Sequence, residues 1–124
     1  MSTSNLFQPI KIGKDTLQHR IVLAPMTRFK ASSKAHVPSN PLVKTFYSQR
    51  GSAPGTLLIT EGTFIDPRAG GYDNAPGIWN KDQINAWHQV WSVPSSLYTL
   101  TQIYPRSLML YMQGDHLYTS SYGH

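Results

Sequence analysis

The chain has 124 residues, of which 40% are hydrophobic and none is cysteine, and its formal net charge is +5. The absence of cysteine excludes disulfides, thiolate metal ligands and a cysteine nucleophile. No apolar run reaches the roughly 18 residues of a membrane span, and residues 1–5 lack the basic and apolar regions of a secretory signal. These features predict a soluble, cytoplasmic protein without a membrane partner.

The positive charge raises the question of nucleic-acid binding. The 11 lysines and arginines stand one at a time along the chain and form neither a dense cluster nor a helical stripe with interleaved aromatic residues. Such a distribution is typical of a solvated surface, so we expect no nucleic-acid partner. The five histidines show no ligand spacing such as HExxH, so no metal site is expected.

The first predicted element is a β-hairpin. A short strand is expected over residues 6–12, a turn over residues 13–15 and a returning strand over residues 16–19. Residues 21–24 follow as a continuous apolar strand, of the type found in parallel sheets that are buried on both faces. Pro25 ends this strand because proline cannot donate to the ladder.

A helix is predicted after the first apolar strand and a polar loop. Asn40 is expected to cap it, with Pro41 at the first helical position and Gly51 at its end. Its apolar residues recur at helical spacing: Leu42, Val43, Phe46 and Tyr47.

A second strand and helix repeat the pattern. An apolar strand is predicted over residues 57–60, and a loop rich in glycine and proline covers residues 64–79. Asn80 is expected to cap the next helix, with Gln83 three residues later completing a capping box. Alternating strands and helices predict an α/β protein with a parallel sheet.

Unusual residues stand where each apolar strand ends. Residues 24–28 are Ala-Pro-Met-Thr-Arg, and residues 60–65 are Thr-Glu-Gly-Thr-Phe-Ile. In a β/α barrel, the loops at the carboxyl ends of the strands converge on one face and carry the chemistry. Together with Gly-Gly-Tyr-Asp-Asn-Ala-Pro-Gly-Ile-Trp at residues 70–79, these segments resemble the N-terminal part of the old yellow enzyme family. The resemblance covers residues 5–91, and members of that family are FMN-dependent, NADPH-oxidising ene-reductases.

The resemblance implies the fold class. We expect an α/β chain with the first two βα units of a TIM (β/α)8 barrel, preceded by an N-terminal β-hairpin. A complete barrel needs about 250 residues, so the barrel is expected to be incomplete. Composition changes after Trp91, since residues 92–124 contain no glutamate, one aspartate, one basic residue and five tyrosines. We therefore predict a barrel part over residues 1–91 and an irregular C-terminal tail over residues 92–124.

The tail is expected to arise from a shifted reading frame. The family continues through a segment similar to VTDAVHAKGSFIYIQLWALG, which residues 106–124 do not resemble as protein. Their codons, started at the third base of the Arg106 codon, permit VTDAVHARGSFIYIQLWA. Some matches are forced, because Met112 followed by Gln113 gives only alanine in that frame. We predict intron sequence over about residues 92–105, followed by an exon read out of frame; the alternative is a genuine, divergent extension.

The same resemblance assigns four residues to a flavin site and one to the substrate pocket. Pro25 and Met26 are implied to present backbone to FMN, and Thr27 to offer its hydroxyl and amide near the flavin O4 edge. Gly62 lets the cofactor approach closely because it has no side chain. Tyr72 is implied to line the substrate pocket. Taken singly, each also has a structural explanation, as a strand end, a turn, a loop glycine or a surface aromatic.

The implied parent activity is reduction of an activated C=C bond in a small enone or enal, with NADPH as reductant. The family's flavin-binding glutamine, carbonyl-gripping His/Asn or His/His pair, proton-donating tyrosine and phosphate-binding arginines lie in later strands and loops. No catalytic residue is therefore assigned, and we expect this chain to be inactive and to form no stable holoenzyme. Arg28 and Glu61 are expected to form an ion pair that braces the loops.

Two other functions stay open. A small non-catalytic interaction protein could reuse two βα units and pair its open sheet edge with a partner. A nucleic-acid binder would show steep salt dependence. The open edges, with the uncharged segment at residues 107–112, also predict a tendency to aggregate.

Overall fold

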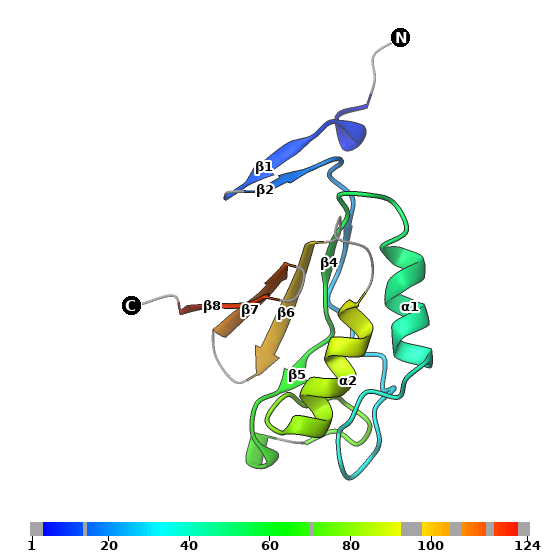
Figure 1. The fold of residues 1–124 in the computed structure, drawn as a ribbon, viewed down its shortest axis with the longest axis vertical. Helices are drawn as coiled ribbons and strands as arrows, with labels where there is room; N and C mark the ends of the chain where they lie inside the picture. Colours follow the sequence, from blue (N-terminus) through cyan, green and yellow to red (C-terminus); the bar gives the residue numbers. More distant parts are fainter. Residues whose placement is uncertain are drawn as a thin grey trace.

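The computed structural model describes residues 4–13, 15–69 and 71–92 with their side chains, and the backbone of residues 98–104, 108–113 and 116–121. Figure 1 shows the elements in chain order: the 3₁₀ helix η1 (Asn5–Phe7), β1 (Ile10–Ile12), β2 (Asp15–Leu17), β3 (Val22–Leu23), α1 (Leu42–Arg50), β4 (Leu57–Ile59), β5 (Thr63–Phe64), the 3₁₀ helix η2 (Pro67–Ala69), α2 (Lys81–Trp91), β6 (Tyr98–Tyr104), β7 (Leu108–Gln113) and β8 (His116–Ser121).

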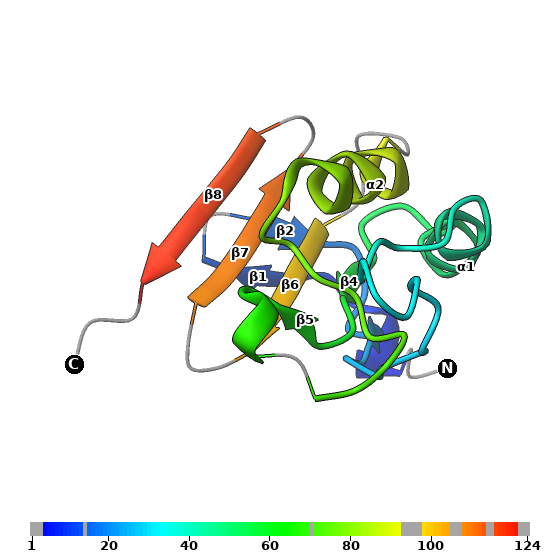
Figure 2. The same cartoon turned by 90° about the horizontal axis from the view of Figure 1, so that it is seen from below.

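The main sheet is parallel where the two βα units meet. β3 pairs with β4 in parallel, with Val22 opposite Leu57 and Leu23 opposite Leu58, and β4 pairs in parallel with β6. The strand order is β3-β4-β6-β7-β8, with β5 pairing alongside β6. Both helices lie on the same side of this sheet, as Figure 2 shows. The predicted α/β arrangement of two strand–helix units is therefore present.

The β1–β2 hairpin lies at the amino ends of the parallel strands (Figure 1). The amide of Gln18 donates to the Gly55 carbonyl at 3.4 Å, and the His19 Nε2 lies 2.9 Å from the Thr56 hydroxyl, just before β4 begins. Gly55 has φ +73°, and a Cβ there would lie 2.4 Å from the Gln18 side chain, so only glycine fits this close approach. The hairpin thus leaves the opposite, carboxyl ends of the strands uncovered.

A cluster of buried side chains joins α1, β4 and α2. Its members are Val43 and Tyr47 of α1, Leu58 of β4, and Trp87 and Val90 of α2. The spacing of four within α1 and three within α2 places each set on one helix face. Trp91 extends the cluster, since its ring is stacked on Trp87 with centroids 5.4 Å apart and planes 4° apart.

The start of α2 confirms the predicted cap. The Asn80 side chain accepts from the Gln83 amide at 3.0 Å, and the Gln83 side chain accepts from the Asn80 amide at 3.2 Å. Each of two amides without a helical partner is thereby satisfied. The Gln83 side chain also donates to the Ala35 carbonyl at 2.9 Å, which fastens the long loop before α1 to α2.

The predicted cap of α1 is wrong. Pro41 occupies the N-cap position and no side chain caps the helix. Asn40 instead donates to the Ala86 carbonyl at 2.9 Å and to the Gln89 side chain at 3.2 Å, both on α2. A tertiary hydrogen bond has replaced the local one, so the residue ties the two helices together. The predicted end of α1 at Gly51 is confirmed.

Three further expectations need correction. Leu6 and Phe7 lie in η1 rather than a strand, because the Ser4 hydroxyl accepts from the Leu6 amide and closes a turn there. The β3 strand is not buried on both faces: Val22 is 38% exposed, since β3 is the outermost strand in the described sheet order. The tail is not irregular throughout, because β6 extends the parallel edge of β4 and β7 and β8 add antiparallel strands.

Replacing Trp87 by alanine tests the packing. The side chain is 2% exposed and its Nε1 donates to the Gly77 carbonyl at 3.1 Å, so truncation leaves a cavity and an unpaired carbonyl. We expect Trp87→Ala to lower the free energy of unfolding by about 3–5 kcal/mol, measured by urea unfolding. Ile84→Ala, on the exposed face of the same helix, should cost about 0.5 kcal/mol. Equal losses for the two variants would contradict this account of the core.

Candidate functional site

The carboxyl ends of β3 and β4 bring two of the motif segments together. Because the two strands are parallel and in register, residues 24–28 and residues 60–62 leave the sheet side by side. The Arg28 amide donates to Glu61 Oε2 at 2.8 Å and joins the segments directly. Thr27 precedes one of these residues and Gly62 follows the other. The structure therefore places Thr27 and Gly62 at the same end of the sheet.

The surface at this end is accessible. Pro25, Met26 and Thr27 are exposed, Met26 at 56%, and Gly62 is half-buried. Within the part of the chain that the structure describes with side chains, no other residue hydrogen-bonds the Thr27 hydroxyl. An accessible hydroxyl and strand-end backbone beside a position without a side chain suit the polar edge of a flat cofactor such as a flavin.

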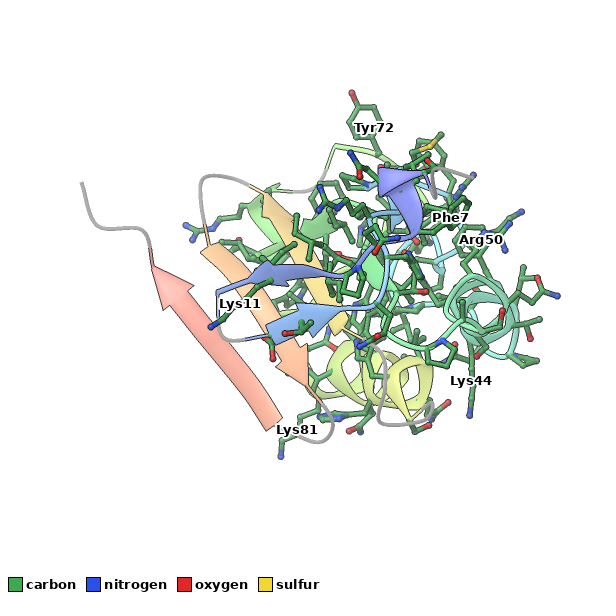
Figure 3. The ribbon with its side chains drawn as sticks, turned by 90° about the horizontal axis from the view of Figure 1, so that it is seen from above. Phe7, Lys11, Lys44, Arg50, Tyr72 and Lys81 are labelled. Carbon is green, nitrogen blue, oxygen red and sulfur yellow. The ribbon has the colours of Figure 1, made fainter. Side chains whose placement is uncertain are left out.

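Tyr72 comes from a different loop and lies beside this surface. It is 68% exposed, and Figure 3 shows it pointing away from the body of the molecule. Its ring meets Phe29 edge to face with centroids 6.4 Å apart. Asn74 holds this loop in place, because its carbonyl accepts from the Ala31 amide at 3.0 Å and its side chain donates to the Ala31 carbonyl at 2.7 Å. The described contact of Tyr72 is thus with Phe29, two residues beyond Thr27.

His36 also links the loop before α1 to the loop before α2. Its Nδ1 donates to the Ala75 carbonyl at 2.7 Å, and its own carbonyl accepts from the Gly77 amide at 2.8 Å. Its ring packs against Phe64 and Trp79 with centroids 5.7 and 5.5 Å apart. Sequence reasoning assigned His36 no role, because neither its neighbours nor its spacing signal a contact with residues 64–79.

Glu61 is a buried carboxylate that accepts two hydrogen bonds. It is 2% exposed, and its Oε2 accepts from the Arg28 amide. The Tyr47 hydroxyl donates to Glu61 Oε1 at 3.5 Å and accepts from the Glu61 amide at 3.1 Å. Burial raises the pKa of Glu61, and the hydrogen bonds from Arg28 and Tyr47 partly offset that rise. The pKa of Tyr47 is also raised, first by burial and then by the charge of Glu61.

Arg28 and Glu61 are hydrogen-bonded, but the predicted ion pair between their side chains is wrong. The bond comes from the Arg28 amide, and the guanidinium lies over the Phe46 ring at 4.5 Å. The Arg50 guanidinium lies over the same ring at 3.6 Å. Among the residues described with side chains, the ion pair is between Arg68 and Asp66, which are 2.9 Å apart and exposed. The Phe46 ring, rather than the Glu61 carboxylate, is therefore the partner of the Arg28 guanidinium.

A pocket of about 280 Å³ lies beside Glu61. It is lined by Arg28, Lys30, Leu42, Val43, Phe46, Tyr47 and Glu61.

The described residues contain no group of three or more histidines, acidic residues or cysteines that could hold a metal ion. No described helix is long and apolar enough to cross a membrane.

The fold and the site define a class. Parallel βα units that carry their distinctive residues at the carboxyl ends of the strands are typical of β/α-barrel proteins. The sequence pattern of the NADH:flavin oxidoreductase / NADH oxidase family matches residues 5–92. The chain therefore belongs to this family, which includes the old yellow enzymes, and the resemblance seen in the sequence is confirmed.

Individual relatives agree with this assignment. A probable inactive reductase, easA, of Epichloe festucae var. lolii is 58% identical over 90 residues, which are 73% of this chain and 23% of that protein. The chanoclavine-I aldehyde reductase fgaOx3 of Penicillium roqueforti is 56% identical over 87 residues, 70% of this chain and 23% of that protein. The old yellow enzyme from Pichia sp. AKU4542 superposes with a TM-score of 0.74 at 37% identity, over 83% of this chain and 27% of that one. The chain thus spans about a quarter of the length of these relatives, and its neighbours imply a TIM barrel as the parent fold.

The raised pKa of Glu61 predicts a pH-dependent stability. Because the folded protein raises this pKa above its ordinary value of 4.5, the native state binds the proton more tightly than the unfolded chain does. The resulting stabilisation is fully present below pH 4.5 and is lost as the pH rises through the folded-state pKa. We expect the free energy of unfolding to fall over that range, and Glu61→Gln to abolish the fall.

The measurement is urea unfolding at a series of pH values above 4.5. Asp66→Asn is the matched control, because that exposed carboxyl has its pKa lowered by Arg68 and titrates below this range. An unchanged slope in Glu61→Gln would show that Glu61 is not the group responsible.

Proposed function

We propose that residues 5–91 supply part of the FMN site of an old yellow enzyme-like, NADPH-dependent ene-reductase. The observation that carries the proposal is the side-by-side placement of residues 24–28 and 60–62 at the carboxyl ends of adjacent parallel strands. Relatives named as an enoate reductase, 41% identical over 90 residues, and as an NADP-dependent oxidoreductase, 49% identical over 87 residues, support the reaction class and the reductant. The proposed substrates are small enones or enals.

The proposed roles follow the placement of each residue. Bound FMN would supply hydride transfer from NADPH to the activated C=C bond. Pro25 and Met26 offer backbone to the ring system, and the Thr27 hydroxyl hydrogen-bonds its polar edge, where it stabilises negative charge. Gly62 leaves room for close approach. Tyr72 forms one wall of the substrate pocket above the ring.

We also propose that the 124-residue chain does not turn over by itself. The family's remaining flavin, substrate and proton-transfer residues belong to later strands, and the phosphate-binding arginines among them contribute much of FMN affinity through charge-assisted hydrogen bonds. The end of the family match at residue 92 supports a boundary between Trp91 and Ser92. Residues 92–124 are proposed to derive from intron sequence and a frame-shifted exon, and the protein is proposed to be cytoplasmic.

Flavin binding tests the first part of the proposal. We expect the purified chain to lose FMN on desalting, because it has the Thr27 and Gly62 edge of the site but not the phosphate site. Flavin fluorescence during a titration with the chain measures this. The protein restored to the family frame should retain stoichiometric FMN, and Thr27→Val in that protein should weaken binding about tenfold or less. Stoichiometric, tightly held FMN in the 124-residue chain would contradict the proposed division of the site.

The transcript tests the origin of the tail. Sequencing across the codons from His88 to Ser107 should find the stretch for about residues 92–105 removed and the frame continuing into a VTDAVHA-like string. A message that is present only in unspliced form, or a genome without that string in the alternate frame, would refute the frame-shift proposal.

One observation favours a second candidate function, a non-catalytic interaction protein. The edge strand β3 and the residue before it expose Val22 and Ile21, and an open strand edge can pair with an extended segment of a partner. A stable complex that forms without flavin would support this candidate. A basic nucleic-acid surface is less well supported, because Lys11, Lys44, Arg50 and Lys81 lie apart around the molecule in Figure 3.

A further inference from the structure

The burial of Glu61 has a large free-energy cost. Its side chain is 2% exposed, and removing a carboxylate from water costs several kcal/mol unless hydrogen bonds compensate. A neutral residue of similar shape would fill the same space without that cost. The hydrogen-bond partners of this carboxyl group should therefore show its function.

One partner of Glu61 belongs to the segment that follows the neighbouring strand β3. The bond from the Arg28 amide to Glu61 Oε2 is 2.8 Å long. Arg28 is the residue after Thr27, and Glu61 is the residue before Gly62. One peptide unit separates each bonded residue from a proposed flavin neighbour, so this bond limits how far the Thr27 end can move from the Gly62 end.

Tyr47 supports the carboxylate from the helix layer. The Tyr47 hydroxyl accepts from the Glu61 amide at 3.1 Å and donates to Glu61 Oε1 at 3.5 Å. Tyr47 is itself 2% exposed and belongs to the buried cluster with Leu58 and Trp87. Glu61 is therefore attached to the buried cluster through Tyr47.

The Arg28 cation and two hydrogen bonds favour the ionised form of Glu61 and partly offset the cost of its burial. Arg28 and Lys30 line the pocket beside it, and Tyr47 is the other titratable group that faces it. A carboxylate accepts from both donors at once, and hydrogen bonds to an ionised acceptor are about twice as strong as neutral ones. Glutamine could accept only through its single amide oxygen.

We propose that Glu61 is a positioning residue that, supported by Tyr47, sets the spacing between the Thr27 and Gly62 ends of the site. The part of the inference that concerns flavin rests on the proposed function. Without the carboxylate, residues 25–28 lose their attachment to the end of β4, and the surface offered to the cofactor opens. Glu61 itself need not touch the cofactor for this effect.

Amide hydrogen exchange of the full 124-residue chain, followed by NMR, tests the positioning role without any flavin. In Glu61→Ala the Arg28 amide should exchange about ten- to a hundredfold faster, while the Val90 amide in α2 stays protected. Glu61→Gln should restore most of the protection, with a rate about three- to tenfold above that of the natural chain. Tyr47→Phe should accelerate the Glu61 amide, which loses its acceptor.

Gln83→Ala is the matched control. Gln83 is also fully buried and also holds loop backbone, but at Ala35 and Trp79, so its loss should leave the Arg28 amide protected. If Glu61→Ala also loses protection at Val90, Glu61→Gln decides: selective acceleration at Arg28 supports the proposal and uniform acceleration refutes it. Unchanged exchange at Arg28 in both Glu61 variants, or an Arg28 amide unprotected in the natural chain, overturns it.

An FMN titration of the same variants separates this inference from the proposed function. If Arg28 is released selectively and FMN affinity falls in parallel, both stand. If Arg28 is released but neither the 124-residue chain nor its frame-restored form binds FMN, the positioning role stands and the flavin function fails.

Discussion

The contact between α1 and α2 over β4 is the interaction on which the rest of the structure depends. The β3–β4 ladder joins only two residue pairs, which is too little to hold two strands together in water. Tyr47, Leu58 and Trp87 supply the missing stabilisation by burying two large aromatic side chains against the strand. The packing of α1 and α2 therefore determines the relative position of the carboxyl ends of β3 and β4. In this way the helices influence the geometry of the site.

Buried and half-buried polar side chains then organise the long loops. Gln83, His36 and Glu61 each bond to backbone groups of a distant segment, and Asn40 does the same between the helices. Loop backbone needs partners whenever it is shielded from water, and these side chains provide them where no strand can. Regular structure occupies little of residues 24–38 and 65–79, yet both loops are fixed in relation to each other.

Local signals in the sequence predicted local structure well. The Asn80–Gln83 capping box was predictable because both partners lie within one helical turn. The role of Asn40 was not, because its partners are on another helix, and nor was the bond from the Arg28 amide to Glu61, because a backbone donor has no side-chain signature. Strand β6 was missed because it pairs along an edge of β4 that only the folded sheet presents. The resemblance proposed Thr27 and Gly62 as site residues, and the structure adds the hydrogen bond between their neighbours Arg28 and Glu61.

The stacking of Trp87 on Trp91 gives the molecule a built-in optical reporter. Two parallel indole rings with centroids 5.4 Å apart couple their electronic transitions, so near-ultraviolet circular dichroism carries a signal that exists only while α2 keeps its helical geometry. The third tryptophan, Trp79, lies outside α2, with its ring 5.5 Å from the His36 ring, and is not part of this stacked pair. Loss of the coupled signal therefore reports the unfolding of α2 itself, which can be followed in the unlabelled protein.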